Sequence, residues 1–82
     1  MEKYKSQMKY HRRGNFLDSE DGKWTICKNK YSKKNNGKAI YTFYTLLNLE
    51  THEYIMDGNK RRTWLDLWDV KKYIEVWSKE TR

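Results

Sequence analysis

The segment formed by residues 39–49 constrains the fold most, because both of its alternating faces are apolar. Aromatic and β-branched residues dominate it, and that composition favours a β-strand. One face carries Ala39, Tyr41, Phe43, Leu47 and Leu49, and the other carries Ile40, Tyr44 and Leu46. A strand that is apolar on both faces belongs inside a sheet, where it is covered on both sides or partly covered by a partner.

Turn signals place further strands on both sides of this segment. Asn35-Asn36-Gly37 and Asp57-Gly58 tolerate the positive φ angles of tight hairpin turns. In residues 23–31, Trp24 and Ile26 alternate with smaller residues, as in a half-buried strand. We therefore expect antiparallel strands over residues 23–31, 39–49 and 53–56, with a short fourth strand over residues 60–64.

Helical spacing begins after Trp64. Apolar residues recur at intervals of three, four and three, and Asp66 stands where an N-cap is expected. The predicted core stripe consists of Leu67, Val70, Ile74 and Trp77, and the polar face carries Trp68, Lys71, Lys72 and Glu75. The predicted fold class is α+β, a small antiparallel sheet of three or four strands packed by a C-terminal amphipathic helix. Trp24, Trp64 and Trp77 are expected in its core.

The N-terminal segment is harder to assign to an element. Tyr4, Met8 and His11 have the spacing of a short helix, whereas residues 14–22 read as a loop. We therefore divide the chain into a basic N-terminal arm and loop over residues 1–22 and a single α+β domain over residues 23–82. A chain of 82 residues is too short for two separately cored domains.

The predicted order of elements has one architectural resemblance. The predicted strand meander, followed by a helix within residues 63–77, resembles the small DNA-binding domains of integrases and related factors. Those domains are built of a three-stranded sheet and a helix. No family motif is matched residue by residue, so no site residue is carried over from this resemblance.

The net charge of +7 is concentrated in three blocks, residues 1–13, 28–38 and 60–62. Cations interleaved with aromatic rings suit nucleic acid, because cations neutralise phosphates and rings stack on bases. Alternatively, these charges solvate a hairpin tip or protect a sheet edge from aggregation. Trp68 is either an exposed binding anchor or a covered structural residue. The candidate contact residues are Arg12, Arg13, Lys28, Lys30, Tyr31, Lys33, Lys34, Lys38, Lys60, Arg61, Arg62 and Trp68.

Little in the sequence indicates catalysis. Cys27 is the single cysteine, so we expect no disulfide, and its place in an apolar strand is typical of an inert buried thiol. His11 and His52 lack the paired spacing of a metal site. We expect a non-enzymatic cytoplasmic protein without cofactor, metal, signal peptide or membrane span.

Two functions fit this composition. The first is a small basic binding module that contacts DNA or RNA through a basic hairpin and its flanking basic blocks. The second is a phage or mobile-element accessory protein that binds and inhibits a host protein, such as an acidic or nucleic-acid-handling defence factor. The second predicts a contact centred on aromatic residues such as Trp68 or Tyr44. A homodimer formed through the second apolar face of residues 39–49 is compatible with either function.

Overall fold

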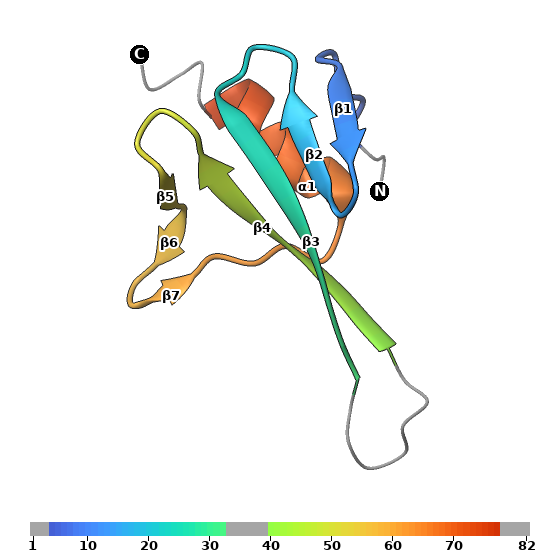
Figure 1. Cartoon of the computed structure of the whole chain (residues 1–82), viewed down its shortest axis with the longest axis vertical. Coiled ribbons are helices and arrows are strands. Elements are labelled where there is room, and N and C mark those ends of the chain that lie inside the picture. Colours follow the sequence, from blue (N-terminus) through green and yellow to red (C-terminus); the bar gives the residue numbers. More distant parts are fainter. Residues whose placement is uncertain (1–3, 33–39, 78–82) are drawn as a thin grey trace.

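The computed structural model describes residues 4–32 and 40–77, which form an antiparallel sheet with a helix behind it (Figure 1). The sheet has five strands in sequence order, and a second sheet has two strands. The larger sheet consists of β1 (Tyr10–Arg13), β2 (Phe16–Ser19), β3 (Trp24–Ser32), β4 (Ile40–Asn48) and β5 (Glu53–Tyr54), and the smaller one of β6 (Met56–Asp57) and β7 (Lys60–Arg61). After them come α1 (Leu67–Lys72) and the π-helical turn η1 (Tyr73–Trp77). The α+β class is confirmed, with five strands in the main sheet instead of three or four.

The additional strands come from the N-terminal segment. The short helix considered for this segment is wrong, since residues 4–22 contain strands and turns but no helix. Gly14 adopts a φ of 64°, which lets β1 turn into β2. Leu17 then lies opposite Ile26 of β3 and packs against the core. Residues 10–19 are therefore part of the same sheet as residues 24–32.

The core lies on the helix side of the sheet. Ile26 and Leu46 face each other across β3 and β4, and both pack against the helix. Their partners in the buried core are Trp64, Val70 and Ile74, with Trp24 partly buried at its margin. The Trp77 side chain lies outside the described residues.

No helix of the described residues lies over the opposite face of the sheet (Figure 1), although the small side chains at its centre, Thr25, Cys27 and Thr45, are buried among their neighbours. Strand alternation puts Tyr41, Phe43 and Leu47 on that face. Within the described residues the helix covers one face of β4, and the alternative that a partner partly covers the other face stays a prediction.

The strand predicted over residues 53–56 is interrupted at Ile55. The Ile55 amide donates to Leu46 O at 2.9 Å, and its carbonyl accepts from the Arg62 amide at 2.9 Å. The predicted fourth strand appears as β7 followed by a single bridge, in which Trp64 and Tyr44 exchange two backbone hydrogen bonds of 2.8 and 2.9 Å. Gly58, with a φ of 64°, makes the expected turn between β6 and β7.

Asp66 occupies the predicted N-cap position of α1, but its side chain makes no capping hydrogen bond. Val70 and Ile74 are buried as the stripe predicted. Among the described residues there is no helix of the length and hydrophobicity that crossing a membrane requires.

Glu75 corrects the predicted polar face, because it is only 5% exposed. Its carboxylate accepts hydrogen bonds from the Tyr4 hydroxyl at 2.9 Å, the Gln7 amide at 2.7 Å and the Tyr10 hydroxyl at 2.9 Å. The Ser6 hydroxyl and the Met8 amide also donate to it. Glu75 therefore fastens the N-terminal segment to the helix.

Candidate nucleic-acid interface

The central feature of the candidate interface is a two-stranded ribbon, residues 29–32 and 40–43, that projects from the sheet (Figure 1). Pairing of β2 with β3 ends at Phe16 and Cys27, followed by one hydrogen bond from the Lys28 amide to Asn15 O. On the other side, the neighbours of β4 end at the bridge between Tyr44 and Trp64. Beyond these points, within the described residues, both edges of the ribbon lack a neighbouring strand.

The helix side of the ribbon and of its base is basic. Lys28 lies opposite Tyr44 and Lys30 opposite Thr42, so both lysines share the face on which Tyr44 packs against the core. Arg12 of β1 joins them at the base, since Arg12 and Lys28 line one pocket. The structure shows no ion pair for any of these three cations with the residues it describes.

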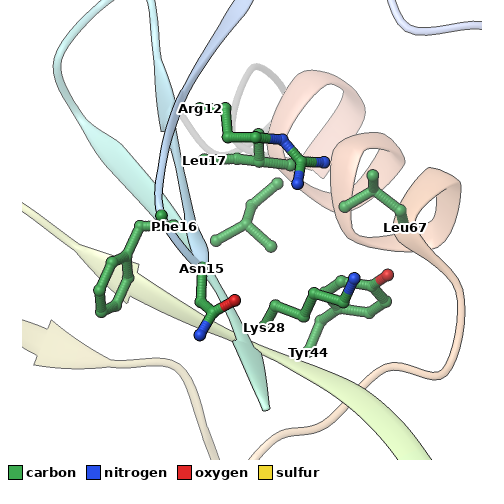
Figure 2. Close-up of a pocket in the computed structure, with 9 residues that line it drawn as sticks. Arg12, Asn15, Phe16, Leu17, Lys28, Tyr44 and Leu67 are labelled. Carbon is green, nitrogen blue, oxygen red and sulfur yellow. The ribbon is translucent and has the colours of Figure 1, made fainter. Parts of the chain in front are cut away.

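The pocket at the base of the ribbon is small, with a volume of about 30 Å³. That is room for one or two groups the size of a water molecule or a phosphate oxygen. Its lining contains no carboxylate and includes the polar side chains of Asn15 and Tyr44. Figure 2 shows Arg12 and Lys28 extending from the sheet toward the side on which Leu67 lies. Leu17, Ile26 and Leu67 form the apolar part of the lining, and the two cations beside them favour an anionic group at the mouth of the pocket.

The uncovered side of the ribbon is aromatic. Tyr31 lies opposite Tyr41, and their rings stack with centroids 5.3 Å apart and planes at 26°. The edge of Phe43 meets Tyr31 at a centroid distance of 6.0 Å. Tyr31 is 55% exposed and Tyr41 44% exposed, so these rings present apolar surface to solvent on a strongly charged protein.

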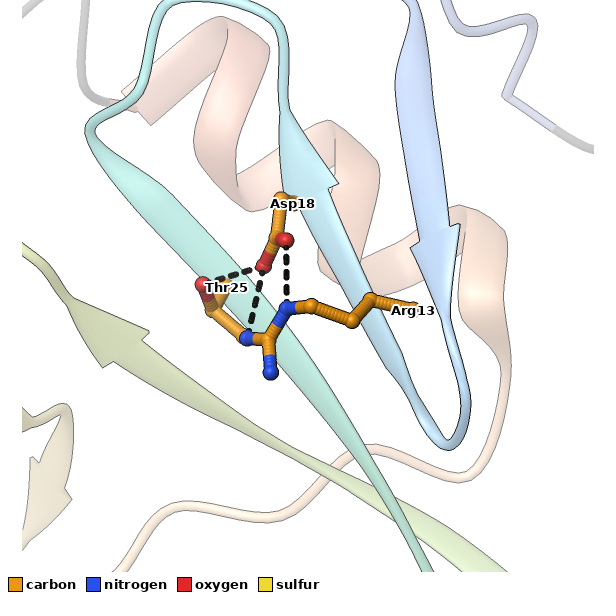
Figure 3. A network of polar contacts seen from close by, with 3 residues as sticks. All are labelled: Arg13, Asp18 and Thr25. Atoms are coloured by element: carbon orange, nitrogen blue, oxygen red, sulfur yellow. Dashed lines mark hydrogen bonds and ion pairs between the residues drawn. The ribbon is translucent and has the colours of Figure 1, made fainter.

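Arg13, another candidate contact residue, belongs to a local network on the same uncovered face (Figure 3). Its guanidinium donates to both carboxylate oxygens of Asp18, at 2.9 and 3.3 Å, and Thr25 donates to the same carboxylate at 2.8 Å. Hydrogen bonds from Arg13 and Thr25 hold the pKa of Asp18 below its ordinary value. The Arg13 charge is therefore paired with a carboxylate at the protein surface, whereas Arg12 has no such partner among the described residues.

The Lys60-Arg61-Arg62 block is divided between two places. The Arg61 guanidinium lies 3.8 Å from the centre of the Tyr54 ring. Arg62 lies over Trp64 and Tyr73, at 5.1 and 5.3 Å. Such cation–π contacts hold both arginine side chains against aromatic rings. Lys60 is exposed at the start of β7.

Trp68, the last of the described candidates, lies half-buried in α1, behind the sheet. Lys33, Lys34 and Lys38 lie outside the described residues.

Cys27, His11 and His52 come from three different parts of the fold, namely β3, β1 and the turn before β5. Cys27 is buried in β3, as expected, while His11 and His52 are both exposed. Among the described residues, no group of three histidine, cysteine or acidic side chains is placed to hold a metal ion.

Three residues of the candidate interface were missed from sequence: Tyr41, Phe43 and Leu65. Tyr41 and Phe43 were assigned only to an apolar strand face, and Leu65 stood outside the predicted helix stripe. The sequence signal for Tyr41 and Phe43 is that they lie on the strand face opposite Tyr44 and Leu46. Because a single helix covers only one face of a strand, the other face stays exposed.

Comparison with protein families, with curated proteins and with solved structures finds no match to this chain.

Proposed function

We propose that this protein is a non-enzymatic module that binds nucleic acid through the ribbon and its base. The observation that carries the proposal is the row of Arg12, Lys28 and Lys30 on one face, without a carboxylate partner in the described residues. Like charges held side by side repel each other, and phosphates relieve that repulsion. The small pocket beside Arg12 and Lys28 suits a phosphate oxygen of a nucleic-acid backbone.

The physical basis of binding is counterion release. Each phosphate that a lysine or arginine neutralises releases condensed cations from the nucleic acid, so the affinity falls as salt rises. The basic side of the ribbon supplies contacts of this kind to the phosphates of the nucleic acid. Such contacts carry no sequence preference by themselves.

A second candidate function follows from the apolar surface near the ribbon. Leu65 is 78% exposed and lies beside the rings of Tyr41 and Phe43. Exposed apolar patches of this kind also anchor protein partners. The second candidate is therefore an accessory protein, of a phage or another mobile element, that inhibits a nucleic-acid-handling host protein.

Reversing both lysines of the ribbon, Lys28→Glu with Lys30→Glu, is expected to weaken binding by at least about tenfold at low salt. The variant is also expected to lower the slope of log K against log salt by about two, since two phosphate contacts are lost. The measurement is a fluorescence-anisotropy titration of labelled single-stranded DNA, double-stranded DNA and RNA at two salt concentrations.

The matched control is the double variant Lys9→Glu with Lys72→Glu. It changes the net charge by the same amount, from +7 to +3 at two charges per reversal, at exposed positions outside the ribbon. Equal losses in both double variants would mean that total charge, not the ribbon, drives binding. If the wild-type protein binds none of the three nucleic acids even at low salt, the function is wrong and a protein partner takes its place.

A further inference from the structure

The ring surface, defined as Tyr31, Tyr41 and Phe43, stabilises the ribbon through its ring contacts, yet Tyr31 and Tyr41 remain largely exposed. Tyr31 and Tyr41 lie beyond the last contact of β2 with β3, and the core cluster of the described residues does not include them. The exposed parts of these rings leave apolar surface in contact with water, which costs free energy. A ligand that covers these rings would recover that area.

The ring surface continues into a groove beside β4. Tyr31, Tyr41 and Phe43 line it together with Thr42, Thr63 and Leu65, and its volume is about 320 Å³. The lining contains no charged side chain, and pockets of this size hold small ligands. Rings and a leucine form a suitable wall for a flat heteroaromatic ring such as a nucleobase.

The charges nearby favour an anionic ligand for this groove. On the uncovered face of the sheet, the carboxylate of Asp18 is already paired with Arg13. Lys28 and Lys30 lie on the reverse side of the same ribbon. The ribbon is narrow, because its two strands are only about 5 Å apart. A polyanion that crosses the ribbon edge therefore meets rings on one side and cations on the other.

We propose that the ring surface and its groove stack unpaired bases, so that the preferred ligand of this module is single-stranded nucleic acid. This inference rests on the proposed nucleic-acid function and adds the class of ligand. Base pairs of a duplex already stack on each other, so their faces are not offered to exposed rings. Unpaired bases present these faces, and stacking on protein rings tolerates any sequence.

The test separates bases from phosphates. Wild-type protein is titrated with a labelled deoxythymidine oligomer of about ten nucleotides, with an abasic oligomer of the same length, and with a duplex of that length. The abasic oligomer keeps every phosphate and lacks every base. We expect the thymidine oligomer to bind at least about tenfold more tightly than the abasic one, and more tightly than the duplex.

Variants locate the effect on the rings. Tyr31→Ala with Tyr41→Ala is expected to remove the preference for thymidine over abasic oligomer, whereas Tyr31→Phe with Tyr41→Phe keeps it because the rings remain. Circular dichroism checks that the alanine variant keeps its fold. The Lys28→Glu, Lys30→Glu variant is expected to weaken binding of both oligomers alike.

Equal binding of thymidine and abasic oligomers, or binding of the duplex as tight as that of the single strand, would overturn the stacking proposal. If the lysine variant still loses affinity in that case, the nucleic-acid function stands and only the class of ligand is wrong. Absence of binding to all three ligands would overturn both proposals and assign the ring surface to a protein partner.

Discussion

Replacing Glu75 by alanine is expected to lower the free energy of unfolding by about 3 kcal/mol. The carboxylate accepts from five donors in the segment that precedes β1 and at its start: the hydroxyls of Tyr4, Ser6 and Tyr10 and the amides of Gln7 and Met8. Without it, these part-buried donors lose their shared acceptor and the segment loses its attachment to η1. Urea unfolding followed by tryptophan fluorescence measures the change.

The control is Glu50→Ala, at an exposed position in the turn between β4 and β5. Surface substitutions of this kind change stability by no more than about 0.5 kcal/mol. A Glu75→Ala variant as stable as Glu50→Ala would show that the network around Glu75 contributes little to folding.

The Glu75 network also gives the protein an acid-sensitive stability. Burial by itself raises the pKa of Glu75, but hydrogen bonds from Ser6, Gln7, Tyr10 and Tyr4 outweigh it and place the pKa below its ordinary value of 4.5. A lowered folded-state pKa contributes stability above the ordinary value, and this contribution is lost as pH falls through the folded-state pKa. Glu75→Gln is therefore expected to flatten the dependence of stability on pH below about 5. An unchanged profile would contradict this assignment.

Strand β4 and the helix were predictable because each has a local signal. Alternation in residues 39–49 and the spacing of Val70 and Ile74 depend on neighbours along the chain, and both elements occur where the sequence indicated. The β1–β2 hairpin has a weaker signal, since only Phe16 and Leu17 are strongly apolar there. Its stability comes from pairing with β3, a contact that no local pattern reveals.

The charged residues of the candidate site were predictable from sequence, but the faces on which they lie and their side-chain partners were not. Sequence places Arg12 next to Arg13, yet strand alternation sends them to opposite faces, where Arg13 pairs with Asp18 and Arg12 lines a pocket. Glu75 was assigned to the polar helix face because its partners come from a segment about 70 residues away. Side-chain partners so distant in sequence are set by the tertiary fold, so helical periodicity alone does not predict them.

Leu46→Ala is expected to cost about 3 to 4 kcal/mol of unfolding free energy, whereas Leu47→Ala is expected to cost about 1 kcal/mol, the typical value for a substitution outside the buried core. The two leucines are neighbours on β4 and lose the same atoms. Leu46 is 0% exposed beneath the helix, whereas Leu47 is half-buried on the opposite face of the sheet, next to Tyr54. Thermal or urea unfolding of both variants, at low and high protein concentration, measures the difference.

This pair of variants also tests the ligand face. A small cost at Leu47, independent of concentration, would mean that the uncovered face is solvated in the free protein and open to a ligand. A cost at Leu47 as large as that at Leu46, and larger at high concentration, would mean that a second copy covers the face, because linked association stabilises the folded chain. In that case a nucleic acid would have to compete with the dimer for the ring surface, so its apparent affinity would fall as the protein concentration rises.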